Sequence, residues 1–223
     1  MNYFAHGRAF VDEPYMLAGT AVPDWLSVVD RQVRVRTKHV APHIDDPDPQ
    51  LAGLARGLAR HFADDAWFHE SRAFAELSLD FCVRWRQALG QEDGFRPHFL
   101  GHILVEILLD ATLIAAEPDR LRAYYAALEQ VDSAVIERNV NQMAPRPTER
   151  LAPLVPAFCR ERFLWDYLED GKLLFRLNQV MRRVGLPTLP QRVIDLFPTA
   201  RGLVAERQQE LLAEPATIEI HSR

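Results

Sequence analysis

The chain is poor in cysteine and shows no excess of positive charge. Its 223 residues include only two cysteines, Cys82 and Cys159, which lie far apart in segments that we predict to be helical. We interpret them as reduced thiols in the core of a cytosolic protein. The formal net charge is -5 and the isoelectric point is about 5.9. This balance argues against a general nucleic-acid-binding protein, because such domains are usually basic.

The sequence also lacks an obvious targeting or membrane-spanning segment. Its first ten residues, MNYFAHGRAF, do not combine a basic start with a long apolar run, so we expect no signal peptide. The most apolar stretch, residues 99–116, contains His102, Glu106 and Asp110, and membrane-spanning helices rarely carry three such groups. We therefore expect a cytoplasmic protein that has neither a membrane nor a nucleic acid as its partner.

Signals for β-strands are weak. Two short segments alternate between apolar and polar residues, VRVR at 33–36 and TIEI at 217–220, and each could be extended loop or tail. No glycine-rich phosphate loop follows a strand, and no internal repeat is apparent. A nucleotide-binding α/β fold is therefore not expected.

Helical periodicity, in contrast, extends along most of the chain between proline-rich breaks. Apolar residues recur at helical spacing over residues 51–62, 67–89, 121–143, 151–168 and 172–184. We predict an all-α fold in which residues 1–223 form a single compact domain of about eight helices. The helices of the candidate site would lie mainly within residues 1–115, and residues 199–223 would form a peripheral helix and tail.

The strongest local pattern is a polar stripe on an apolar helix. His98, His102, Glu106 and Asp110 recur every fourth residue in an otherwise almost entirely apolar segment. Such a helix is normally buried, and burying these groups is unfavourable unless they are paired or bound to metal. Three such steps rise about 18 Å, so all four residues cannot share one ion, whereas His102 and Glu106 can. The stripe predicts a metal site or, alternatively, a buried hydrogen-bond network without metal.

A second stripe places His61, Asp65 and His69 at the same four-residue spacing. Imidazole nitrogen and carboxylate oxygen together suit zinc, manganese or iron, and magnesium less well. We interpret Asp64 as a bystander because it falls off this stripe. The alternative is the N-terminal region of a helix, with an aspartate as its cap and His69 on a solvated face.

Two further candidates lie near the start of the chain. His6 stands alone between Ala5 and Gly7, and a lone histidine is more often structural than a ligand. Asp24 follows Pro23, and an aspartate at such a position commonly forms a cap or a turn. Neither residue would be a strong candidate by itself.

The order of these residues resembles a known family. Residues 1–6, MNYFAH, and residues 17–24, LAGTAVPD, resemble the start of acyl carrier protein phosphodiesterases, in which the second segment is a small-residue turn that ends in aspartate. Residues 61–65, HFADD, resemble the central His-x-x-x-Asp of that family, and residues 98–100, HFL, resemble a later aromatic-rich segment. Residues 19–24 and the two stripes also resemble, more weakly, the zinc-dependent phospholipase C group. Both resemblances cover about the first 110 residues.

Both resemblances imply a helical bundle, in the first case related to HD-type phosphohydrolases, that hydrolyses a phosphoester. We expect a metal-dependent phosphodiesterase that acts on acyl carrier protein or another phosphodiester, with water activated by one or two divalent ions as the nucleophile. Asp65 or Glu106 would orient or deprotonate that water. His69 and Asp110 would hold ligand rings in one tautomer. The expected ligands, divided between the ions, are His6, Asp24, His61, Asp65, His98, His102 and Glu106.

The densest basic run follows Asp24 closely and contains Arg31, Arg34, Arg36 and Lys38. It could bind the substrate phosphate or an acidic carrier protein. The alternative is a solvated loop or edge strand. The sequence also departs from the family, because Phe62 follows His61 where HD domains have aspartate, and Pro97 precedes His98 where we expect aspartate.

Two other classes of protein stay open. Di-iron carboxylate proteins use a Glu-x-x-His spacing, and the predicted buried helices contain none, which argues against that metal chemistry. A non-catalytic helical protein would instead use the stripes as a structural network and bind a partner, for example a second copy of itself through its C-terminal third. This alternative predicts no bound metal.

Overall fold

The computed structural model describes residues 1–90 and 94–214, which form helices joined by loops, with no β-strand among them. The predicted all-α fold is confirmed. Short 3₁₀ helices are η1 (Arg8–Phe10), η2 (Ala41–His43), η3 (Phe163–Leu168) and η4 (Gln191–Leu196). The α-helices are α1 (Tyr3–Gly7), α2 (Pro14–Val29), α3 (Thr37–Val40), α4 (Pro49–Glu70), α5 (Arg72–Leu89), α6 (Pro97–Ala116), α7 (Pro118–Leu128), α8 (Ser133–Met143), α9 (Leu151–Glu161), α10 (Asp170–Arg183), α11 (Phe197–Glu206) and α12 (Gln208–Leu211).

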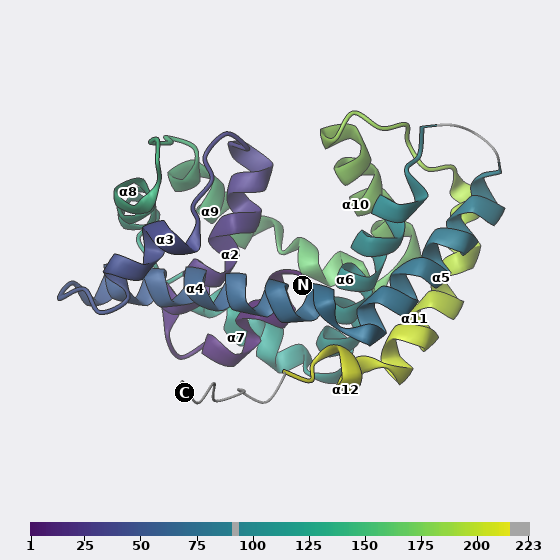
Figure 1. The fold of residues 1–223 in the computed structure, drawn as a ribbon, viewed down its shortest axis with the longest axis horizontal. Coiled ribbons are helices and arrows are strands. Elements are labelled where there is room, and N and C mark those ends of the chain that lie inside the picture. The colour runs from purple at the N-terminus through teal and green to yellow at the C-terminus, as the bar shows by residue number, and fades with distance from the viewer. Residues whose placement is uncertain (91–93, 215–223) are drawn as a thin grey trace, which may run out of the picture.

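One long helix, α4, runs across the molecule (Figure 1). α2 packs along α4 on one side, with α8 and α9 near it, and α5 packs along α6 on the other side, with α10 and α11 near them. The short helix α1 contacts α2, α4 and α6. The start of the chain therefore lies between the two groups of helices.

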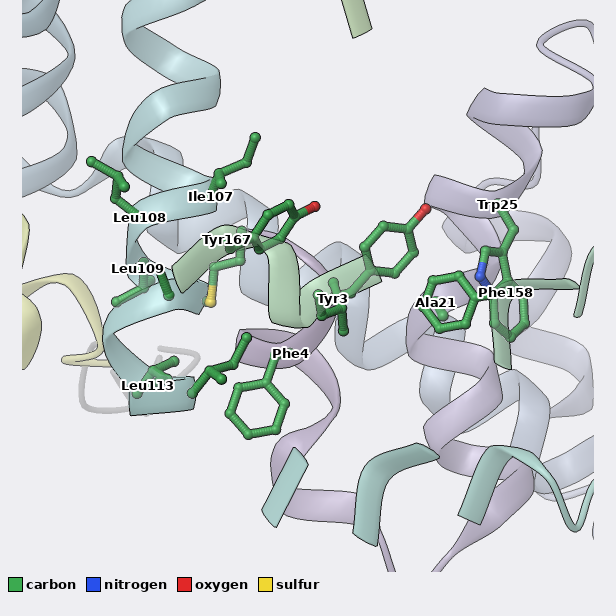
Figure 2. Close-up of a cluster of buried hydrophobic side chains, with 14 of the residues drawn as sticks. Tyr3, Phe4, Ala21, Trp25, Ile107, Leu108, Leu109, Leu113, Phe158 and Tyr167 are labelled. Carbon is green, nitrogen blue, oxygen red and sulfur yellow. The ribbon is translucent and has the colours of Figure 1, made fainter. Parts of the chain in front are cut away.

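Aromatic side chains anchor this start of the chain in the core (Figure 2). Tyr3 and Phe4 of α1 are buried, and the Tyr3 ring centroid lies 5.0 Å from that of Phe158 on α9. Phe158 in turn lies 5.5 Å from Trp25 on α2. Burying each such side chain contributes about 1.5–3 kcal/mol. This packing holds α1, which carries His6, against its neighbours.

Glycines allow α2 and α4 to approach closely. A Cβ atom on Gly19 would overlap the carbonyl oxygen of Leu54, and one on Gly57 would overlap the carbonyl oxygen of Met16. Backbone atoms cannot move aside as a flexible side chain can, so only glycine fits at these two positions. The close contact sets the separation between the helix that carries Asp24 and the helix that carries the second polar stripe.

The helix α6 passes through the core. By length and composition alone it could cross a membrane, but 61% of its apolar window is buried inside the protein. That burial is the behaviour expected of the core helix of a soluble protein. The two cysteines, Cys82 and Cys159, are both buried and free, as the sequence predicted.

Two local expectations need correction. Residues 17–24, expected to form a turn, lie inside α2, which continues past Pro23. Their apolar side chains repeat at helical spacing and are buried, and this burial outweighs the hydrogen bond that proline removes. Residues 33–36 form no strand, although buried valines still alternate there with exposed arginines. Residues 217–220 lie outside the described residues.

The helices are also shorter and more numerous than we predicted. The predicted helix 67–89 is interrupted at Ser71, and the predicted helix 121–143 is interrupted before Asp132. Both side chains accept hydrogen bonds from backbone N–H groups at the start of the next helix, so each acts as an N-cap. The predicted C-terminal helix corresponds to α11 and α12.

Candidate metal centre

Three of the predicted metal ligands lie close together where α1 contacts α4. We call His6, His61 and Asp65 the His6 cluster. The two imidazole rings stack with centroids 4.1 Å apart, and each faces a different oxygen of the Asp65 carboxylate: His6 Nε2 lies 3.3 Å from Oδ1, and His61 Nε2 lies 3.3 Å from Oδ2. An ion that bonds to three such donors in a tetrahedron needs them about 3.3 Å apart. One ligand atom from each of the three residues lies within 4.8 Å of the other two, so small shifts of the side chains would let them hold a single metal ion.

Outer contacts orient both rings of this cluster. His6 Nδ1 donates to Asp64 at 3.0 Å, and the other oxygen of Asp64 forms an ion pair with Arg60 Nε at 2.7 Å. His61 Nδ1 donates to the carbonyl oxygen of Thr20 at 2.8 Å. Metal-binding histidines commonly have such a partner on the second nitrogen, which leaves the Nε2 lone pair free for the metal. Asp64 is therefore part of the site, and our interpretation of it as a bystander is corrected.

The electrostatics of the His6 cluster follow from this pairing. Burial opposes the charged form of His6, but the hydrogen bond to Asp64 and the close Asp65 carboxylate outweigh burial and raise the pKa of His6 to about 9. Burial alone would raise the pKa of Asp65, yet the close imidazole rings of His6 and His61 hold that pKa well below its ordinary value. Without a metal, the cluster is thus a tight ion pair.

A second cluster lies beside the first. We call His69, His102 and Glu106 the His69 cluster, and its three potential ligand atoms also lie within 4.8 Å of one another. His69 Nε2 is 2.9 Å and His102 Nε2 is 3.2 Å from the same Glu106 oxygen, Oε1. His69 comes from the last turn of α4 and the other two from α6. From the sequence we expected His69 to orient the ring of a ligand, whereas its Nε2 faces the Glu106 carboxylate directly.

The two clusters adjoin each other through the Met1 nitrogen. This nitrogen lies 2.7 Å from Asp65 Oδ1 and 3.4 Å from Glu106 Oε1. The two carboxylate oxygens are therefore no farther apart than the sum of these distances. Burial raises the pKa of Glu106, but the ammonium group and hydrogen bonds from His102 and His69 outweigh burial and lower it to about 2.

Asp24 faces both clusters from α2 without belonging to either. Its carboxyl group is half-buried, and its buried Oδ2 has no hydrogen-bond partner among the described residues. Burial raises its pKa, while the nearby charges of His61 and His6 act in the opposite direction. A buried oxygen without a partner is unfavourable. Asp24 is therefore a further candidate ligand.

Asp110 has a different role from the one we expected. It contacts no ligand ring, and instead accepts hydrogen bonds from the backbone N–H groups of Phe4 at 3.0 Å and Ala5 at 2.7 Å. Burial raises its pKa to about 7, although these two hydrogen bonds favour the ionised form. Asp110 holds the helix on which His6 lies, rather than the ring of His6.

His98 lies outside both clusters. It is exposed in the first turn of α6, and its Nε2 lies 3.2 Å from Arg86. Each four-residue step along a helix turns the side chain by about 40°, so His98 is directed away from Glu106 two steps later.

Within the basic run, only Arg31 reaches the cavity that Asp24 and Glu106 line. The members outside that cavity are Arg34, Arg36 and Lys38.

A cavity of about 440 Å³ opens beside the two clusters. Asp24 and Glu106 line part of its wall, and most of the remaining wall is apolar, with Trp25 and Ile107 among its residues. Its volume lies in the usual range for small-molecule sites. A ligand in this cavity would have access to carboxylates of both the candidate metal centre and α2.

The donor set of both clusters fits divalent transition metals. Two imidazoles and one carboxylate are typical of catalytic zinc, which keeps one coordination position for water or substrate. His6 Nε2 is buried and makes no well-formed hydrogen bond, as expected for a ligand atom prepared for a metal. The arrangement can therefore hold one ion at each cluster.

Comparisons of this chain with protein-family models, with curated proteins and with solved structures found no match.

Proposed function

We propose that this protein is a metal-dependent phosphoester hydrolase with two neighbouring metal positions. The observation that carries the proposal is the adjacency of the His6 and His69 clusters, whose carboxylates both contact the Met1 nitrogen, with Glu106 of the second cluster at the wall of a cavity. Enzymes that hydrolyse phosphodiesters often use two ions about 3.5–4 Å apart. The separation of Asp65 and Glu106 is compatible with such a pair.

The residues in and beside the cavity would have different roles in the hydrolysis. Divalent ions held by the clusters would polarise a phosphoryl oxygen and acidify a water molecule. Glu106 and Asp24 present carboxylate oxygens on the cavity wall, where they could orient that water and accept its proton. Asp65 is held between two imidazoles and would act mainly as a ligand. Arg31 at the cavity would pair with negative charge on the substrate.

The two clusters can be tested separately by elemental analysis of protein purified without a metal-affinity tag. We expect about two equivalents of zinc, manganese or iron in the wild-type protein, and the loss of about one in His61→Ala and of the other in His69→Ala. The exposed His98→Ala variant is the matched control and should keep both. Hydrolysis of bis(p-nitrophenyl) phosphate should fall roughly 100-fold or more in the first two variants only.

Release of 4′-phosphopantetheine from holo-acyl carrier protein is the second assay, because it tests the specific substrate that the sequence resemblance implies. Absence of metal from the wild-type protein, even after incubation with these ions, would favour a non-catalytic network of histidines and carboxylates. Metal binding without hydrolysis of any phosphodiester would instead place the protein in another class of metalloprotein.

A further inference from the structure

The cavity beside the clusters has a second polar region, which is positively charged. Arg31, Arg176 and Arg183 all line it. Arg176 is neutralised by ion pairs with Glu161 at 2.7 Å and Asp166 at 2.6 Å. Within residues 1–90 and 94–214, neither Arg31 nor Arg183 forms an ion pair with a carboxylate. Two uncompensated positive charges therefore border the cavity.

Backbone contacts hold Arg31 in place at this border. Its Nε donates to the carbonyl oxygen of Ser27 at 3.2 Å, and its Nη2 donates to the carbonyl oxygen of Arg183 at 2.7 Å. These bonds tie the loop after α2 to the last turn of α10. They use only part of the donor capacity of the guanidinium group, which has five N–H groups. The remaining donors are available to a ligand.

The side chain of Arg183 is the freer of the two. It is exposed, and no hydrogen bond to a described residue engages its guanidinium group. Its charge acts on the buried hydroxyl of Tyr3: burial raises the pKa of Tyr3, and the positive charge of Arg183 opposes this rise. Figure 2 shows the hydroxyl groups of Tyr3 and Tyr167, which also line the cavity, pointing to the same side. Arg183 therefore lies near the polar ends of these aromatic side chains.

Apolar surface separates the arginines from the candidate metal centre. Arg31 follows Asp24 by seven residues and lies in the loop after α2, which ends at Val29. Trp25 and Val28 lie between them in the sequence and line the cavity, and Phe163 lines it from η3. A ligand that reaches from the carboxylates to the arginines must therefore pass over an apolar wall.

We propose that the substrate is amphipathic and carries, besides the phosphoester, an apolar arm and a second anionic group that Arg31 and Arg183 bind. This inference rests on the function proposed above, because the phosphoester would lie at the Asp24 and Glu106 wall. The apolar arm is matched by the Trp25 wall, and the anion by the two uncompensated guanidinium groups. Such charge-assisted hydrogen bonds are strong beside apolar surface, where water competes poorly.

The test measures binding, so it does not depend on turnover. We would titrate metal-free protein with two fluorescent probes, the anion 1-anilinonaphthalene-8-sulfonate and the neutral N-phenyl-1-naphthylamine, which share an aromatic body. Wild-type protein should bind the anion about tenfold more tightly than the neutral probe. Arg183→Gln should abolish this preference and leave binding of the neutral probe unchanged, and Arg183→Lys should retain part of it.

Two controls show whether both probes bind in the cavity. Arg182→Gln changes the adjacent exposed arginine, which does not line the cavity, and should behave as the wild type. Ala157→Trp should fill the cavity and weaken binding of both probes, whereas Ala126→Trp on the exposed face of α7 should not. Circular dichroism of each variant checks that the fold is kept.

Equal affinity of the wild type for both probes, or an equal loss of preference in Arg182→Gln and Arg183→Gln, would overturn the proposal. Unchanged binding in Ala157→Trp would overturn it as well. These outcomes are distinct from failure of the proposed hydrolase function, which would appear as absent metal or absent phosphodiester hydrolysis in a protein that still prefers the anionic probe.

Discussion

The ring of His6 depends on side chains that need not touch a metal. Asp64 accepts the Nδ1 hydrogen, and Arg60 fixes the other oxygen of that carboxylate. These contacts keep the hydrogen on Nδ1 and direct Nε2 toward Asp65. Asp64 is almost completely buried, so water cannot easily replace it. The orientation of the His6 ring is therefore set by Asp64 as much as by His6 itself.

Asp64→Ala should weaken metal binding at the His6 cluster by about 10–100-fold, because the His6 ring loses the partner that orients it. Binding at the His69 cluster should stay unchanged. The measurement is competition with a chromophoric chelator. Asp80→Ala, which removes a partly buried ion pair with Arg84 within α5, is the control and should change neither site. Equal weakening in both variants would show that the effect is not specific to the His6 contact.

Among the helices, the contact of α2 with α4 has the greatest consequence for the site. The glycine pair Gly19 and Gly57 lets these helices approach until the carbonyl oxygen of Thr20 receives the Nδ1 hydrogen of His61. The same approach brings Asp24 within electrostatic reach of His6 and His61. The candidate site is thus assembled by a backbone contact, and any residue larger than glycine there would separate its parts.

Gly57→Ala should destabilise the protein by about 1–3 kcal/mol or more, because its Cβ would overlap the backbone of α2. It should also lower the metal content of the His6 cluster. Urea unfolding and elemental analysis would measure the two effects. Gly202→Ala on α11 meets no atom within 4 Å and should instead stabilise the helix by up to about 1 kcal/mol. Similar stability changes in both variants would contradict the close-contact argument.

For the molecule as a whole, protons and metal ions compete for the same groups. Without metal, the His6 pKa of about 9 lies above its ordinary value of 6.5, so His6 stabilises the fold fully below pH 6.5 and loses this contribution as the pH rises through 9. Glu106 has a pKa of about 2 in place of 4.5, so its contribution is present above pH 4.5 and is lost as the pH falls through 2. Metal binding must displace the His6 proton.

We therefore expect the Tm of the metal-free protein to fall between pH 6.5 and 9, whereas the affinity for zinc rises over the same interval. Binding at pH 7.5 should release about one proton from His6. Calorimetry in buffers with different ionisation enthalpies measures this proton, and thermal unfolding measures the Tm. Zinc affinity that does not change from pH 6.5 to 9 would contradict the assignment of protonated His6 as a ligand group.

The sequence by itself determined the helical class and the two polar stripes, because helical periodicity is local and is set by side chains three and four residues apart. It also identified His6 and Asp24, through resemblance. It could not determine which helix faces meet. Only the tertiary structure placed His69 opposite Glu106, joined Asp64 to His6, and left His98 exposed. The physical reason is that burial of apolar faces and the α2–α4 glycine contact set these distances, and neither is visible in the spacing of polar residues.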